Sequence, residues 1–103
     1  MPEPRIVQTG DHAVVAFDGD LTSSTVLEVR PKLNALIAAG VKELVFDFER
    51  TSFVDSSGIG MMLSAHNSLS KAGGRIQAVK ASTDLMTLFK SMRLDKHFTV
   101  TGQ

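Results

Sequence analysis

The sequence contains no cysteine. This absence excludes disulfides, thiol catalysis and cysteine-ligated metals, and it suits a reducing compartment. Net charge is also absent, because eleven acidic residues balance eleven lysines and arginines, so no electrostatic surface for nucleic acid or anionic lipid is predicted. No apolar run approaches the roughly 20 residues that cross a bilayer, and the first residues lack the apolar core of a signal peptide. We therefore expect a cytoplasmic protein with neither a membrane nor a nucleic-acid partner.

Apolar side chains, in contrast, are plentiful. The chain has 103 residues, of which 43% are hydrophobic, enough for one packed core and too few for two. No internal repeat and no low-complexity segment interrupts it. Residues 1–103 are therefore expected to form a single domain.

Residues 53–60 mark a change from a strand pattern to a helix pattern. Before them, residues 44–48 are rich in β-branched and aromatic side chains. After them, Ile59, Met62 and Leu69 recur at a spacing typical of a helix with one buried face. The turn therefore lies between the carboxyl end of a strand and the amino end of a helix, where open α/β sheets usually place functional groups.

Short polar residues and glycines fill this turn. Asp55 or Ser56 can serve as the N-cap of the helix, because an oxygen-bearing side chain can accept a hydrogen bond from a first-turn amide. Gly58 and Gly60 each cost up to about 1 kcal/mol relative to alanine in a helix, so a property other than helix propensity selects them. Their missing side chains leave space around Ser57. Capping alone remains an alternative explanation for the two serines and the aspartate.

A continued helix places Ser57, Met61, Ser64 and Ser68 on one stripe, since residues three and four apart share a helix face. This stripe is turned away from the apolar face that contains Ile59. We interpret it as a small, partly apolar docking surface with one hydroxyl at its tip.

Turn signals and periodicity outline the remaining elements. The expected elements are strands at 6–9 and 13–17, a helix ending before Gly40, a strand at 44–48, a helix at 57–72, a strand at 75–80, a helix from Ser82 or Thr83 to Met92, and a strand at 98–100. Pro31 lies within the first helical pattern and lacks an amide donor, which predicts either a kink or a helix that begins near it.

This order predicts an α/β fold with a mixed sheet (β-β-α-β-α-β-α-β), an amino-terminal hairpin and right-handed crossovers after it. We expect helices on both sides of the sheet. Both faces of the strand at 44–48 would then be mostly dry.

Signatures of catalysis are missing. Gly58-Ile59-Gly60 is followed by Leu63, where a dinucleotide-binding motif requires glycine or alanine, and no P-loop occurs. A nucleophile elbow needs glycine two residues before its serine, and Asp55 stands there instead. We expect neither an enzyme nor a cofactor.

The histidines and two further aspartates offer little chemistry. His12, His66 and His97 lack the spacing of metal ligands, and His66 is expected to be a packed, hydrogen-bonded side chain on the apolar helix face. Asp18 and Asp20 flank Gly19 and only weakly match the paired acids of receiver domains. No metal site is expected.

Three segments together resemble a known family. Residues 54–60 have the sequence Val-Asp-Ser-Ser-Gly-Ile-Gly, residues 44–48 precede them as a strand, and Gly73-Gly74-Arg75-Ile76 follows. This combination resembles the STAS domain of bacterial anti-sigma factor antagonists, and the similarity extends over nearly the whole chain. The resemblance implies a single STAS-like domain with an N-terminal hairpin and helices packed on the sheet.

The resemblance also implies a phosphorylation site and a set of partners. In that family the second serine of the Asp-Ser-Ser-Gly motif is phosphorylated by an anti-sigma factor that is also a serine kinase of the HATPase type. The matching residue is Ser57, and on physical grounds alone Ser56 remains an alternative. A serine phosphatase is the expected third partner, since it would reset the switch.

The implied docking face surrounds Ser57. Its expected members are Asp20, Thr22, Asp55, Ser56, Gly58, Met61 and Ser64. Many relatives read Gly-Glu-Leu-Asp where this chain has Gly-Asp-Leu-Thr at residues 19–22, so an acidic side chain is missing at Thr22. We expect this change to affect phosphorylation efficiency more than partner binding.

A second class of function remains open. STAS domains also serve as small subunits of lipid-transport ABC assemblies, in which the equivalent surface binds and regulates an ATPase without phosphorylation. Both functions predict a binding module that uses the same surface.

Overall fold

Strands and helices occur in the predicted order in the structure, a computed structural model that describes residues 4–103. The elements are β1 (Arg5–Thr9), β2 (His12–Ala16), α1 (Ser23–Ala38), β3 (Glu43–Asp47), α2 (Ser56–Lys71), β4 (Arg75–Ala81), α3 (Thr83–Ser91), the 3₁₀ turn η1 (Leu94–Lys96) and β5 (Thr99–Gly102). Gly10 joins β1 to β2 with a φ of 61°, a conformation that glycine adopts without strain. The predicted hairpin is confirmed.

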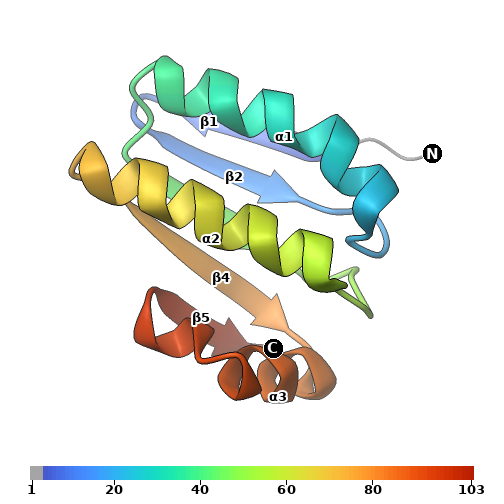
Figure 1. Ribbon diagram of the computed structural model, residues 1–103. Coiled ribbons are helices and arrows are strands. Elements are labelled where there is room, and N and C mark those ends of the chain that lie inside the picture. Colours follow the sequence, from blue (N-terminus) through green and yellow to red (C-terminus); the bar gives the residue numbers. More distant parts are fainter. Residues whose placement is uncertain (1–3) are drawn as a thin grey trace.

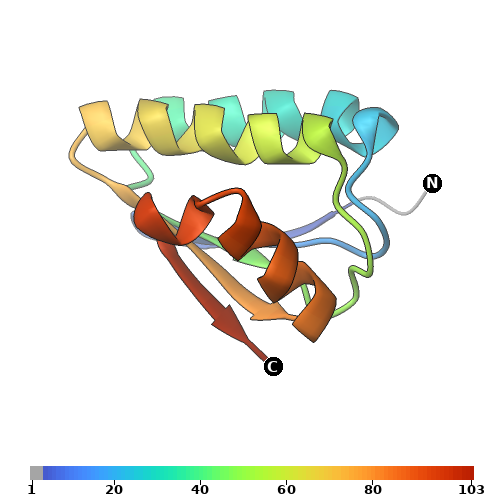
Figure 2. The same ribbon diagram turned by 60° about the horizontal axis from the view of Figure 1, so that its bottom comes forward.

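The five strands form one sheet in the order β1-β2-β3-β4-β5. β1 is antiparallel to β2, and the other neighbours are parallel. From β2 onwards, each helix connects a strand to the neighbouring parallel strand, and the chain always moves towards the same edge of the sheet. Right-handed crossovers then place α1, α2 and α3 on one face. Figures 1 and 2 show the helices on the same side of the sheet. The expectation of helices on both faces is wrong, because it requires the strand order to reverse direction.

Burial of the strands follows this one-sided cover. On the helix-covered face of the sheet, Leu44, Phe46 and Phe48 are fully buried. On the opposite face, Val7 pairs with Val14 across the hairpin, and Val7 is 64% exposed. The hydrophobic core therefore lies between the sheet and its single layer of helices.

Helix α1 runs without interruption through Pro31. The prediction that the helix begins near this proline is wrong. Val26 and Val29 before Pro31 and Leu33 after it are all buried, so packing on both sides stabilises the helical path. Pro31 itself is exposed, and the carbonyl of Leu27 that it leaves without a helical partner lies on an exposed residue.

An aromatic cluster fills the core below the carboxyl ends of β2 and β3. Phe17 stacks on Phe46 and Phe48 with ring centroids 5.9 and 5.5 Å apart. Phe89 of α3 contacts Phe48 with centroids 5.4 Å apart. These rings anchor the ends of both strands, from which the loops of the candidate site begin.

A charge cluster occupies the other end of the sheet. Glu43 accepts from Arg75 at 2.6 and 2.7 Å and lies 3.1 Å from His12 Nδ1. Hydrogen bonding by the Arg75 guanidinium, followed by the attraction of Arg75 and His12, holds the pKa of Glu43 below its ordinary value of 4.5. Because the folded pKa is lowered, this contribution to stability is complete above the ordinary value and disappears as the pH falls through the folded value.

We therefore expect Glu43→Gln to lower the melting temperature at neutral pH and to lose this effect in acid. Thermal unfolding of both proteins from neutral to acidic pH measures the difference. Glu28→Gln is the matched control, because Glu28 is an exposed residue of α1 and is not part of this charge cluster. A Glu43→Gln deficit that stays constant at every pH would contradict the role assigned to the carboxylate.

Candidate functional site

Two loops joined by hydrogen bonds build the site, and we call residues 17–22 and 48–55 the loop pair. Leu21 N donates to Phe53 O at 3.0 Å, and Asp55 N donates to Leu21 O at 3.1 Å, forming a bridge between Leu21 and Val54. The buried Thr51 hydroxyl donates to Gly19 O at 2.9 Å. The segment that leads into α1 and the segment that leads into α2 are therefore held in one register.

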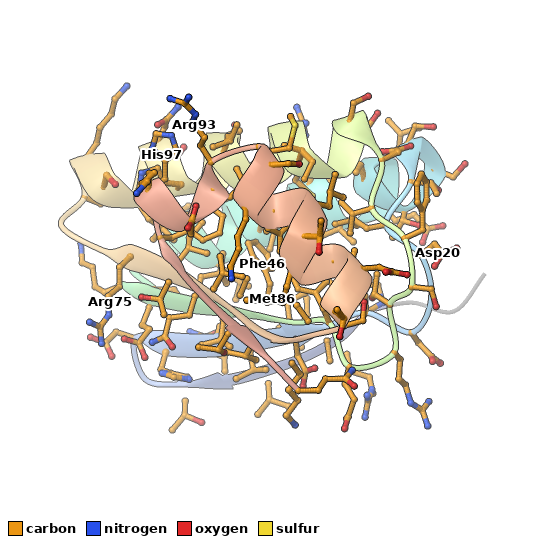
Figure 3. The ribbon with its side chains drawn as sticks, turned by 90° about the horizontal axis from the view of Figure 1, so that it is seen from below. Asp20, Phe46, Arg75, Met86, Arg93 and His97 are labelled. Carbon is orange, nitrogen blue, oxygen red and sulfur yellow. The ribbon has the colours of Figure 1, made fainter. Side chains whose placement is uncertain are left out.

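Asp20 fastens the outer part of the loop pair. Its Oδ1 accepts hydrogen bonds from the amides of Ser52 at 3.3 Å and Phe53 at 3.1 Å. Asp18 instead pairs with Arg50 at 3.1 Å, so the two aspartates have separate partners and do not resemble the paired acids of a receiver domain. Figure 3 shows Asp20 at the end of the molecule opposite Arg75. The exposed Asp20 thus positions the loop that precedes the predicted phosphorylation site.

Asp55 caps both long helices. Its Oδ1 accepts from Gly58 N at 3.1 Å, as an N-cap of α2 should. Its Oδ2 accepts from Ser23 N at 3.2 Å, while Thr22, the N-cap residue of α1, makes no side-chain cap hydrogen bond. One carboxylate therefore fixes the amino ends of α1 and α2 relative to each other. Of the two proposed caps, Asp55 holds the position and Ser56 does not.

Ser57 is the second residue of α2 and is half-buried, whereas Ser56 is exposed. Within residues 4–103 neither hydroxyl forms a hydrogen bond of its own with another residue. Ser57 also lines an open groove. The predicted phosphorylation site therefore lies on the wall of this groove and is not enclosed in the core.

The groove lies between α1 and α2 and has a volume of about 650 Å³. The helices run side by side on the sheet in both ribbon views (Figures 1 and 2). The lining residues of this α1–α2 groove are Ser23, Val26, Leu27, Arg30, Pro31, Asn34, Ser57 and Gly60. Its lining is largely apolar, and Arg30 is its one charged side chain.

Met61 does not belong to an exposed surface. It is 2% exposed and belongs to the core, so the prediction that it contacts a partner directly is wrong. Because α1 lies beside α2 on the same face of the sheet, α2 packs one stripe against the strands and turns a second stripe, which contains Met61, towards α1. Ser64 on that second stripe remains exposed, and its role in partner binding stays a prediction.

The two glycines of α2 play different roles. A Cβ on Gly58 would lie 2.7 Å from Val54 Cγ1 and 2.9 Å from Leu21 Cγ, so the buried Gly58 lets the helix approach the loop pair. The prediction of a direct contact between Gly58 and a partner is therefore replaced by a positioning role. A Cβ on Gly60 would meet nothing within 4 Å, and this glycine instead keeps one wall of the α1–α2 groove flat.

Alanine at the two positions should therefore change stability in opposite directions. Each substitution gains up to about 1 kcal/mol of helix propensity. At Gly58, overpacking against two buried side chains costs about 1 to 3 kcal/mol and outweighs that gain. Urea unfolding should show Gly60→Ala as the more stable and Gly58→Ala as the less stable variant. Equal stabilisation of both would contradict the close approach at Gly58.

Two exposed apolar residues near the loop pair and the groove were not predicted from the sequence. Leu27 is 78% exposed and Phe53 is 53% exposed. Phe53 comes directly before the bridge residue Val54, and Leu27 is outside the buried stripe of α1. The sequence did carry two signals for these residues. Phe53 is an aromatic residue in a polar loop, and Leu27 does not follow the helical spacing of the buried residues of α1. Arg30 was missed as well, because only the packing of α1 beside α2 places it near Ser57.

His66 is packed but only partly satisfied. Its ring lies 5.6 Å from that of His97 and 5.9 Å from that of Phe98. Its Nδ1 is buried and has no hydrogen-bond partner among the described residues, so the expected hydrogen bond is missing at that atom. Across residues 4–103 no three side chains of the usual ligand types gather to hold a metal.

No helix in the described part of the chain has both the length and the apolar character needed to cross a membrane.

Comparisons with known proteins agree with the fold. The STAS domain family model matches residues 3–102. The anti-sigma F factor antagonist of Lysinibacillus sphaericus is 30% identical over 83 residues, which are 80% of this chain and 71% of that protein.

Solved structures extend the likeness to three dimensions. The Bacillus cell fate determinant SpoIIAA in its phosphorylated form superposes with a TM-score of 0.78 at 25% identity, covering 94% of this chain and 89% of that one. An anti-sigma factor antagonist from Mycobacterium paratuberculosis has a TM-score of 0.84 at 20% identity, covering 97% of this chain and 85% of the other. The chain therefore belongs to the STAS domain family and groups by sequence and fold with the anti-sigma factor antagonists.

Proposed function

We propose that this protein switches a sigma factor on by partner switching. In its unphosphorylated form it binds an anti-sigma factor serine kinase of the HATPase type, which then releases the sigma factor. Phosphorylation of Ser57 by that kinase ends the interaction, and a serine phosphatase restores it. The observation that carries the proposal is the half-buried Ser57 hydroxyl on the wall of an open apolar groove.

The rigid support of Ser57 favours a binding switch over a refolding switch. Backbone hydrogen bonds of the loop pair and the two bonds accepted by the Asp55 carboxylate fix the start of α2. A phosphate carries about 1.5 to 2 negative charges, and the amino end of a helix stabilises an anion. Phosphorylation is therefore expected to leave α2 folded and to act on the partner.

The size of that action follows from Coulomb's law. Two like charges about 6 Å apart at an effective dielectric near 20 repel by roughly 3 kcal/mol. One acidic group on the partner facing Ser57 is thus enough to weaken binding about a hundredfold. The buried Met61 supplies none of this effect, contrary to the contact predicted from the sequence.

The exposed surface around Ser57 suits a protein partner. The exposed Leu27 lines the groove, and the exposed Phe53 precedes the motif by one residue. Asp20, Thr22, Ser56 and Ser64 remain accessible at its margins. Similarity to SpoIIAA, which has been solved in a phosphorylated form, supports assigning the switch to this surface.

Incubation with the cognate kinase and ATP, followed by peptide mapping, tests the proposal. We expect one phosphate on the peptide that contains residues 54–60, at Ser57. Ser57→Ala should abolish the modification, and the matched Ser56→Ala variant should retain it. A serine that stays unmodified with every cognate kinase would overturn the switch and favour the alternative, an ATPase-binding subunit of a lipid-transport assembly.

A further inference from the structure

Arg30 lies opposite the first turns of α2. It lines the α1–α2 groove together with Ser57 and Gly60. It also lines a smaller adjoining cavity with Met61 and Ser64. Since these residues occupy successive turns of α2, Arg30 faces the segment that begins at Ser57, across the space between the two helices.

Arg30 has no acidic partner among the described residues, whereas several other cations form ion pairs. Arg50 pairs with Asp18, Arg75 with Glu43, and Lys80 with Asp47. Within residues 4–103, Arg30 forms no ion pair, and no carboxylate lines the groove beside it. An exposed guanidinium next to apolar side chains is therefore available to an anion that arrives at the groove.

A phosphate on Ser57 would need such a countercharge. The Asp55 carboxylate already accepts from Gly58 N and Ser23 N at the starts of both helices. The helix dipole favours a further anion at this end, but the Asp55 carboxylate repels it and already occupies the Gly58 amide. The planar fork of a guanidinium matches phosphate oxygens in two parallel hydrogen bonds, and Gly60 leaves the path from α1 free of a side chain.

We infer that Arg30 is the phosphate receptor of this switch, binding phosphoserine 57 across the α1–α2 groove and closing the groove in the modified protein. The inference rests on the proposed function, because it assigns a regulatory contact to the same serine. When Arg30 binds the phosphate, it neutralises part of the new charge. Its side chain then covers part of the apolar groove wall beside Leu27. The phosphorylated protein would therefore lose its docking surface as well as repel its partner.

Phosphorus NMR of the full chain tests the contact between Arg30 and the phosphate. No kinase is needed, because phosphoserine can be installed at position 57 by codon-directed incorporation. The measurement is the second pKa of the phosphate in four proteins: the parent chain, Arg30→Gln, Arg30→Lys and Arg75→Gln. Arg75 is the matched control, since it lies at the far end of the sheet from Asp20 (Figure 3). Thermal unfolding verifies that each variant is folded.

The parent and Arg75→Gln should show a second pKa about 0.5 to 1 unit below that of Arg30→Gln, because a nearby cation favours the dianion. The second pKa of Arg30→Lys should lie between those of the parent and Arg30→Gln, since lysine retains the charge without the planar guanidinium. Phosphorylation should shift the Nε–H signal of Arg30 in the parent and in Arg75→Gln, both of which retain Arg30. Equal pKa values in all four proteins would overturn the contact.

The Arg30–phosphate contact and the proposed function can be disproved separately. A kinase that leaves Ser57 unmodified, combined with a normal phosphate shift in the synthetic phosphoprotein, would reject partner switching and retain the contact. Phosphorylation at Ser57 with no dependence on Arg30 would reject the contact and retain partner switching.

Discussion

Ser57→Asp should bind the anti-sigma factor kinase about a hundredfold more weakly than Ser57→Ala, because a carboxylate placed about 6 Å from an acidic partner group costs roughly 3 kcal/mol. Aspartate carries one charge and phosphate nearly two, so the variant is expected to reproduce part of the effect of phosphorylation. Ser57→Ala removes only a hydroxyl that has no partner within the domain, and it should bind as well as the parent. Isothermal titration at fixed ionic strength measures both affinities.

The dependence of binding on salt and a second charged variant on α2 test whether charge at residue 57 causes this difference in affinity. Raising the ionic strength should narrow the difference between the two variants, since exposed charges are screened within about 10 Å at 0.1 M salt. Ser64→Asp places the same charge two turns further along α2, and it should weaken binding less than Ser57→Asp. Equal affinity of Ser57→Asp and Ser57→Ala would argue strongly against a charge-operated switch at this residue.

Asp55→Ala should destabilise the fold by about 1 to 3.5 kcal/mol. Loss of the α2 N-cap costs about 0.5 to 2 kcal/mol, and loss of the hydrogen bond to Ser23 N adds about 0.5 to 1.5 kcal/mol. For a domain of this size such a change lowers the melting temperature by roughly 5 to 25 °C. Urea unfolding with an unchanged slope provides the measurement.

Two other N-cap positions are the controls for Asp55. Thr22→Ala removes a cap residue that makes no side-chain cap hydrogen bond, and it should cost under about 0.5 kcal/mol. Ser82→Ala removes a single cap hydrogen bond, from Leu85 N at 3.2 Å, and should cost about 1 kcal/mol. If Asp55→Ala costs no more than Ser82→Ala, the second bond to Ser23 contributes nothing to stability.

Local chemistry made much of this fold predictable. The Gly10-Asp11 turn predicts the hairpin, and the apolar alternation of residues 44–48 predicts a strand whose Leu44, Phe46 and Phe48 share a buried face. Each of these signals depends on neighbours within one turn or one strand. The Asp-Ser-Ser-Gly motif likewise places Asp55 at a helix start, where the structure confirms it as the cap.

Relations between helices were less accessible from the sequence. A helical wheel distinguishes a buried stripe from its opposite, but it does not say that α1 lies against the flank of α2. The burial of Met61 and the position of Arg30 both result from this one-sided packing. The second hydrogen bond of Asp55 joins it to Ser23, a contact between distant segments that only the assembled loop pair creates.

The most direct test compares the wild-type chain with and without phosphate on Ser57 in a titration against the same anti-sigma factor kinase. Partner switching through this site predicts tight binding of the unmodified protein and binding weakened about a hundredfold or more after phosphorylation, with the original affinity restored by a serine phosphatase. Indistinguishable dissociation constants for the two forms would contradict it.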